Sequence, residues 1–199
     1  MKRFFSLFSS SAKELNNVRC LAVTGMLLAL AIVIRSFSIE ITPELRISFG
    51  FIPIVAIAML YGPVVCGMSN FLLDILGFLI DNKSGRGYYP PLALVTIIAG
   101  IIYGIFLYRK QLNFILIALS RAGVVLICNI ILNSYILYTG LIGRTLDFTD
   151  STSLHSFYIW FAPRVIKNAI QLPFDIGLLC ILLPAIYLAY KKTVKISRT

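Results

Sequence analysis

Five polar residues recur at helical spacing in the apolar stretch near the C-terminus. Arg164, Lys167, Asn168, Gln171 and Asp175 fall at i, i+3, i+4, i+7 and i+11, which places them on one stripe of a helix. An arginine can bind a carboxylate through two parallel hydrogen bonds, and an asparagine offers both donors and an acceptor. The stripe therefore favours a site for an anionic ligand, and a polar contact that joins two helices is the alternative.

Two further pairs of polar residues interrupt apolar stretches at one-turn spacing: Asn70 with Asp74, and Asn129 with Asn133. A buried carboxylate can accept two parallel N–H bonds from an amidine-like group, which makes Asp74 a candidate for ligand recognition. Pairing of Asp74 with a base of the C-terminal stripe is the alternative. The asparagine pair fits the edge of a heterocycle, and it equally fits a bridge between two helices.

The elements that must position these residues are more apolar than a soluble core allows. The chain has 199 residues, of which 59% are hydrophobic and 13% charged, whereas soluble domains average about 45–50% apolar and about 25% charged residues. A folded domain of this size still exposes much of its surface, so lipid is the expected solvent. We therefore predict an all-α membrane protein with a single membrane domain.

Six apolar stretches are candidates to cross the bilayer, which takes roughly 20 residues per helix. They cover about residues 20–37, 47–60, 64–80, 92–108, 114–141 and 157–190. The expected organisation is a cytoplasmic tail at 1–19, a six-helix transmembrane domain at 20–190 and a basic cytoplasmic tail at 191–199. We expect Ser38–Arg46 to be a loop, because it contains Pro43 and two glutamates.

The distribution of lysine and arginine predicts that both termini are cytoplasmic. With the N-terminus inside, ten basic residues fall in inner segments: Lys2, Arg3, Lys13, Arg19, Arg109, Lys110, Lys191, Lys192, Lys195 and Arg198. Four fall in outer loops: Arg46, Lys83, Arg86 and Arg144. Cytoplasmic loops hold an excess of such residues and contact anionic membrane lipid. The formal charge of +10 comes with no signature of nucleic-acid binding, so nucleic acid is not an expected partner.

Ionisable residues inside the expected spans leave a positive surplus. The basic ones are Arg35, Arg121, Arg164 and Lys167, and the acidic ones are Asp74 and Asp175, so the balance is 4 − 2 = +2. Charges inside a membrane are costly and usually face a cavity or a partner, and the surplus favours an anionic ligand. For Arg35 and Arg121, intramembrane pairing or snorkelling toward the span ends is the alternative.

Two aromatic pairs lie at expected outer ends of spans: Tyr88 with Tyr89, and Phe49 with Phe51. Aromatic residues at this depth are commonly interface anchors, and a flat ligand can also stack on them. Neither pair decides between these two roles.

Small residues line one side of the first span. Ala22, Gly25 and Ala29 follow one another at spacings of three and four, a pattern that lets another helix approach closely. The approaching helix can belong to this chain or to another subunit.

Motifs of common enzymes do not occur in the sequence. It contains no G-x-x-x-x-G-K-[ST], no H-E-x-x-H and no G-x-S-x-G. The single histidine, His155, falls in an expected outer loop, and the four cysteines lie far apart in apolar stretches. We therefore expect a protein that is not an enzyme and that needs no cofactor or metal.

The order of several short motifs adds a resemblance to a known family. Arg46-Ile-Ser-Phe-Gly-Phe-Ile-Pro53, Tyr61-Gly-Pro-Val-Val65 and Asp74-Ile-Leu-Gly77 resemble the substrate-binding S components of energy-coupling factor (ECF) vitamin transporters. The later motifs are similar to the folate-specific branch of that family. They are Gly87-Tyr-Tyr-Pro-Pro91, Gly100-Ile-Ile-Tyr-Gly104, and Pro163-Arg-Val-Ile-Lys-Asn168 with Gln171-Leu-Pro173.

The resemblance implies a six-helix S component in a bacterial plasma membrane that captures folate from outside with high affinity and without chemistry. Its partners would be the transmembrane coupling subunit EcfT and two cytoplasmic ATPases. The small-residue face of Ala22, Gly25 and Ala29 would then dock against helices of the coupling subunit.

Folate matches the chemistry of the candidate residues. Its flat pterin presents an amino-pyrimidine edge with adjacent N–H donors, and its glutamate tail carries two carboxylates. Asp74 is the candidate for the pterin edge, beside Asn70 and with Asn133 or Asn168 as neighbour. The candidates for the tail are Arg164, Lys167 and Arg46, and the candidates for ring stacking are Tyr89 and Phe51.

Three alternatives remain open at this point. The first is an S component for another vitamin, such as pantothenate or cobalamin. The second is a membrane-embedded enzyme acting on lipid, for which we find no nucleophile or metal constellation. The third is a membrane subunit without a ligand, against which the two cations of the stripe argue.

Overall fold

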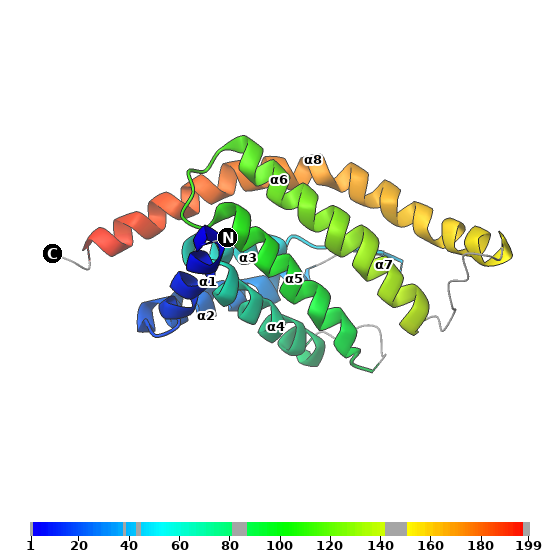
Figure 1. Cartoon of the computed structure of the whole chain (residues 1–199), viewed down its shortest axis with the longest axis horizontal. Coiled ribbons are helices and arrows are strands. Elements are labelled where there is room, and N and C mark those ends of the chain that lie inside the picture. Colours follow the sequence, from blue (N-terminus) through cyan, green and yellow to red (C-terminus); the bar gives the residue numbers. More distant parts are fainter. Residues whose placement is uncertain (1, 38, 43–44, 81–86, 142–150, 197–199) are drawn as a thin grey trace.

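The fold is a bundle of apolar helices in which one helix is much longer than the others (Figure 1). The structure, a computed structural model, describes residues 2–37, 39–42, 45–80, 87–141 and 151–196. The helices are α1 (Lys2–Glu14), α2 (Val18–Ser36), α3 (Phe51–Tyr61), α4 (Pro63–Ile80), α5 (Pro90–Leu107), α6 (Phe114–Val124), η1 (Val125–Leu132), α7 (Asn133–Ile136), η2 (Leu137–Leu141) and α8 (Ser151–Ile196).

Five helical stretches of the described residues are long and apolar enough to cross a membrane. They are Val18–Ser36, Pro63–Ile80, Pro90–Leu107, Phe114–Gly140 and Phe157–Thr193. This confirms a multi-pass, helical membrane protein. The remaining apolar helix, α3, has 11 residues and at 1.5 Å per residue is only about half as long as the roughly 30 Å hydrocarbon core is thick.

The short helix α3 forms the centre of the bundle. Val55, Ala56, Ile57 and Ala58 are all fully buried, and α3 contacts α2, α4, α5 and α8. A helix that is apolar on every side is one that neighbours surround. The core of the protein is therefore built around α3, while the longer helices turn one side outward.

Two segments depart from the sequence-based expectations. Ser38–Arg46 is not simply a loop, because β1 (Ile39–Thr42) pairs antiparallel with β2 (Leu45–Ile47) in the register Ile39↔Ile47. The β-branched residues Ile39, Ile41 and Thr42 explain the pairing, since such side chains favour strands. The N-terminal tail is also structured, because it contains the helix α1.

Ser11 attaches α1 to the bundle through hydrogen bonds. Ser11 Oγ donates a hydrogen bond to the carbonyl of Tyr61 at 2.7 Å and accepts from the N–H groups of Val64 and Val65 at 3.1 and 3.3 Å. The first N–H groups of a helix have no partner within the helix, and Ser11 supplies one at the start of α4. The turn between α3 and α4 is thereby held against α1.

Helices α4 and α5 approach closely at glycine positions. A Cβ added to Gly100 would lie 2.7 Å from Nδ2 of Asn70 and 2.9 Å from the carbonyl oxygen of Cys66. This close approach lets Asn70 Nδ2 donate to the carbonyl of Thr96 at 2.9 Å. The glycine thus fixes the orientation of a polar side chain deep between two spans.

The two longest spans differ in regularity. The stretch from α6 to η2 contains the π-helical segments η1 and η2, in which the hydrogen bonds run from i to i+5. The other, α8, is one continuous helix of 46 residues with Pro163, Pro173 and Pro184 in its interior. Figure 1 shows α8 running alongside α6 and extending past the rest of the bundle at its C-terminal end.

Candidate functional site

A cavity of about 270 Å³ lies among the spans. Its walls come from α2, the β2–α3 connection, α3, α4, α5, α6, η1 and α8. Its polar lining residues are Arg35, Ser48, Asn70, Thr96, Tyr103, Arg121, Asn129, Lys167 and Gln171. A concave site with a few convergent polar groups in apolar surroundings is the usual form of a small-molecule site.

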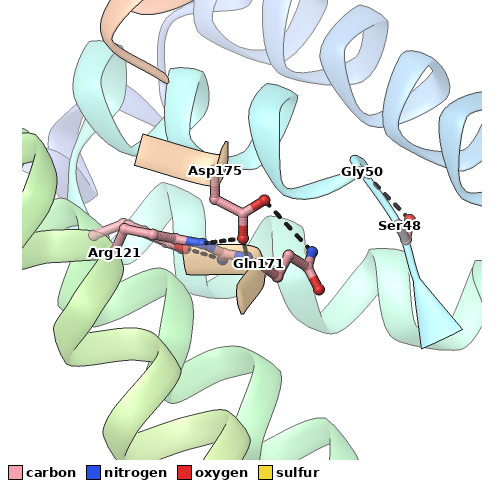
Figure 2. A network of polar contacts seen from close by, with 6 residues as sticks. Ser48, Gly50, Arg121, Gln171 and Asp175 are labelled. Atoms are coloured by element: carbon pink, nitrogen blue, oxygen red, sulfur yellow. Dashed lines mark hydrogen bonds and ion pairs between the residues drawn. The ribbon is translucent and has the colours of Figure 1, made fainter. Parts of the chain in front are cut away.

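Arg121 of α6 lines the cavity and forms an ion pair with Asp175 of α8 (Figure 2). Arg121 Nη2 and Nε lie 2.6 and 3.1 Å from Oδ2 of Asp175, and Arg121 Nη1 donates to the hydroxyl of Tyr103 at 2.6 Å. The side chains of Arg121 and Asp175 are only 7% and 1% exposed. The pairing alternative for Arg121 is therefore confirmed.

The guanidinium of Arg121 is held on its face as well as at its edge. Its Cζ lies 3.9 Å from the centroid of the Phe51 ring. A cation over an aromatic face is attracted by the ring quadrupole, and the attraction grows when water is excluded. Phe51, Tyr103 and Asp175 together define a single orientation of Arg121.

Gln171 joins this network through one end of its amide only. Its Nε2 donates to Oδ1 of Asp175 at 3.4 Å, as Figure 2 shows. Its Oε1 is buried and has no hydrogen-bond partner among the described residues. An unsatisfied buried acceptor is costly, so this carbonyl is poised to accept an N–H from a bound molecule.

Three of the predicted binding residues line the cavity: Phe51, Asn70 and Lys167. They come from α3, α4 and α8, three helices that meet only in the folded chain. Asn129 and Gln171, from the other predicted polar groups, line it as well. Arg35, Arg121 and Lys167 make the lining cationic, and Asp175 pairs with Arg121 from outside the lining.

Two predicted residues of the α8 stripe contact their own helix instead of lining the cavity. The guanidinium Cζ of Arg164 lies 4.0 Å from the centroid of the Trp160 ring. Asn168 Nδ2 donates to the carbonyl of Arg164 at 2.8 Å. The stripe is therefore divided, with Lys167 and Gln171 at the cavity and Arg164 with Asn168 beside it.

Asp74 lies away from the cavity lining, at the end of α4. Its Oδ2 accepts a hydrogen bond from Tyr88 at 3.1 Å. The Arg35 guanidinium packs against Gly77, one turn further along the helix. Burial and the nearby Asp74 carboxylate raise the pKa of Tyr88, so the phenol keeps the proton that it donates.

Three other predicted residues also lie outside the cavity lining. Tyr89 packs its hydroxyl against Gly140 of η2. Arg46 lies in β2 opposite Glu40, and its side chain is outside the part of the chain that the structure describes. Asn133 is half-buried at the start of α7, whereas its predicted partner Asn129 does line the cavity.

Asn129 lies inside the π-helical segment η1, and Asn133 begins α7 directly after it. Ser134 Oγ donates to the carbonyl of Asn129 at 3.5 Å, five residues back. Of the two asparagines, only Asn129 lines the cavity, which their spacing in the sequence does not reveal.

Other cavity residues gave little or no signal in the sequence. Tyr103 and Ser48 lie within apolar or motif segments and were not candidates, and Arg35 had an equally good explanation as a snorkelling residue. Gln171 did belong to the α8 stripe, where its spacing marked the correct face.

The small-residue face of α2 points away from the bundle. Ala22, Gly25 and Ala29 are exposed, while Thr24 and Leu28 are buried. A Cβ added to Gly25 would meet nothing within 4 Å. The helix that this face can admit is therefore not another described element of the same chain.

Comparison with known proteins identifies relatives across nearly the whole chain. The family model for the ECF transporter substrate-specific component matches residues 19–183. The folate transporter FolT of Clostridium novyi is 28% identical over 159 residues, which cover 80% of this chain and 84% of the relative. The folate transporter FolT of Streptococcus mutans is 40% identical over 96 residues, 47% of this chain and 50% of the relative.

A solved structure supports the same relationship in three dimensions. A crystal structure of FolT bound with folic acid is similar to this chain with a TM-score of 0.70 and 32% sequence identity. The match covers 83% of this chain and 92% of the other.

Proposed function

The chain belongs to the substrate-specific components of ECF transporters, and we propose that it binds folate and delivers it for import. As a transporter component, it is not an enzyme. The observation that carries the proposal is the similarity to a FolT bound with folic acid. The polar cavity among the spans is the site where this chain would hold the vitamin.

The pterin ring of folate fits the inner part of the cavity. Gln171 Oε1 is an unpaired acceptor for the N–H donors of the amino-pyrimidine edge, and Asn70 and Asn129 lie on the same lining. Phe51 offers an aromatic surface beside them, since flat rings stack on such side chains. Arg121 and Asp175 act by holding Gln171 and Phe51 in place.

The glutamate tail fits the cationic lining of the cavity. Its two carboxylates match a lining that carries Arg35, Arg121 and Lys167 and no carboxylate among the residues that the structure describes. The cavity volume of about 270 Å³ is near the lower end for drug-sized ligands, about 300–1,000 Å³. The tail would therefore extend past the cavity toward Arg164, one turn before Lys167 on α8.

The predicted residues outside the cavity remain part of the proposal as its outer rim. Most of them lie on elements that form the cavity walls or flank them: Asp74 with its partner Tyr88, Tyr89, Asn133 and Asn168. Arg46 belongs to the hairpin next to Ser48, which lines the cavity. Movement of the Asp74–Tyr88 contact on ligand binding would let Asp74 reach the N–H donors of the pterin edge, and movement of the hairpin would bring Arg46 to the carboxylates of the tail.

The membrane arrangement that we propose has six crossings with both termini in the cytoplasm of a bacterium. The short helix α3 would be the second crossing, completed by the hairpin before it. The distribution of basic residues favours this orientation. The coupling subunit EcfT and two cytoplasmic ATPases would be the partners, with EcfT docking on the exposed face of Ala22, Gly25 and Ala29.

Isothermal titration of ligand-free protein with folic acid, beside pantothenate and cobalamin, tests the proposed ligand. We expect tight one-to-one binding of folate alone. Gln171→Leu should weaken it about tenfold or more, because the ring donors lose a buried acceptor, while Gln111→Leu, at an exposed position, should not. Folded protein that binds pantothenate or cobalamin in preference to folate would reject the assignment.

A further inference from the structure

A second cavity lies at the other end of the bundle. It has a volume of about 610 Å³ and is bordered by the ends of α1 and α3, the segment after α5, and the C-terminal part of α8. It shares no lining residue with the cavity described above. Its chemistry therefore needs an explanation of its own.

The walls of this cavity combine apolar and cationic surfaces. Leu60, Leu107 and Leu112 contribute aliphatic side chains, and Arg109 and Lys110 contribute positive charge. Glu14 is the one carboxylate on the lining, so the cations outnumber the anions by 2 − 1 = +1. An occupant that matches both surfaces has an apolar part and an anionic part.

The tyrosines of the cavity place it at the boundary of the membrane. Tyr187 and Tyr190 of α8 line it, directly before Lys191 and Lys192. Tyrosine is enriched where hydrocarbon meets headgroups, and basic residues lie just beyond. The apolar helix α5 ends at Leu107, so Arg109 and Lys110 lie at the same boundary.

Two local features at this boundary are unusual for a segment that only connects α5 to α6. Arg109 has a φ of 54°, a left-handed conformation that is uncommon outside glycine and that clusters at functional positions. The neighbouring hydroxyl of Tyr108 is buried without a hydrogen-bond partner among the described residues. Burial raises the pKa of Tyr108, so the hydroxyl keeps its proton close to the cations.

We propose that this cavity binds one anionic phospholipid, with the phosphate near Arg109 and Lys110 and an acyl chain along Leu60, Leu107 and Leu112. Phosphate is attracted by paired cations, and anionic lipid is concentrated in the cytoplasmic leaflet. The bound lipid would hold the C-terminal part of α8 against α1 and α3. The proposal is independent of the identity of the vitamin.

Native mass spectrometry of the full chain in neutral detergent and phosphate-free buffer tests the proposal. The probes are dioctanoyl phosphatidylglycerol, dioctanoyl phosphatidylcholine and inorganic phosphate. We expect one tightly bound phosphatidylglycerol, with the other two probes at least about tenfold weaker, because each lacks either the net charge or the apolar part. Equal binding of phosphatidylcholine, tight binding of phosphate alone, or no binding of phosphatidylglycerol would overturn it.

Two double variants distinguish a specific site from general attraction to a basic surface. R109Q/K110Q and K191Q/K192Q each remove two positive charges near the same boundary. Arg109 and Lys110 line the cavity, so the first variant should lose about 25-fold in affinity for phosphatidylglycerol, about a factor of five per charge. Lys191 and Lys192 are not among its lining residues, so the second variant should lose much less. Thermal unfolding of the lipid-free proteins checks that both variants are folded.

Two results with these variants would contradict the proposal. Equal losses in both would mean that the lipid responds only to overall charge. Unchanged lipid binding in R109Q/K110Q, with loss of co-purification with the coupling module, would identify the cavity as a protein contact instead.

Discussion

Replacing Asp175 by asparagine should destabilise the protein more than any other single Asp→Asn change among its spans. The substitution keeps the shape of the side chain and removes its charge, which leaves the guanidinium of Arg121 in a site where only 7% of the side chain is exposed. Phe51, stacked at 3.9 Å on the guanidinium, cannot replace the missing anion.

The magnitude follows from the contacts that are lost. Asp175 accepts from Nε and Nη2 of Arg121 and from Nε2 of Gln171, and hydrogen bonds between membrane helices average about 0.6 kcal/mol each. Their sum, about 2 kcal/mol, is a lower bound, because breaking a buried pair also strands a charge and costs about 3–5 kcal/mol. We expect a loss of about 3 kcal/mol in the free energy of unfolding.

The assay is reversible unfolding of the ligand-free protein in mild detergent, followed by helical circular dichroism. The matched control is Asp74→Asn, a half-buried carboxylate that accepts from Tyr88 at 3.1 Å; with that one hydrogen bond among the described residues, the expected loss is about 0.6 kcal/mol. The double variant Arg121→Met/Asp175→Leu should regain most of the stability, since no charge remains unpaired. Losses for Asp175→Asn and Asp74→Asn that agree within about 0.5 kcal/mol would refute the reasoning.

Three further changes probe the packing and the outer surface. Gly100→Ala should cost about 1–3 kcal/mol in unfolding free energy, because its Cβ would lie 2.7 Å from a neighbouring side-chain nitrogen. The control Gly177→Ala, whose Cβ would meet nothing within 4 Å, should leave the melting temperature unchanged or raise it. Ser11→Ala should lower the free energy of unfolding by about 1–2 kcal/mol, because it removes the buried cap at the start of α4. The control Ser9→Ala, at an exposed position, should change it little. Equal melting temperatures of the two variants would contradict a capping role for Ser11. Gly25→Leu should leave the melting temperature and folate affinity unchanged and weaken co-purification with the coupling module, and unchanged co-purification would remove this face from the interface.

Much of the helical framework was predictable from local sequence. The apolar stretches and their lengths identify membrane helices because each helix must satisfy its own backbone in lipid. The face of α8 that carries Lys167 and Gln171 was also readable, because a 3.6-residue period places them on one side whatever packs there. The hairpin at Ile39–Ile47 was not predicted. A short polar segment that contains proline is equally typical of a loop and of a turn between two strands, so its sequence does not distinguish them.

The composition of the cavity was decided by tertiary structure. Arg121 and Asp175 are 54 residues apart, and nothing in their local spacing tells which of several charged residues in the spans will meet. Asn129 lines the cavity and Asn133 does not, although their spacing in the sequence is that of neighbours on one helix face. The class of the protein and the polar stripe of α8 thus follow from local periodicity and hydrophobicity, while the contacts of Arg121, Asp175 and Gln171 depend on how the helices pack.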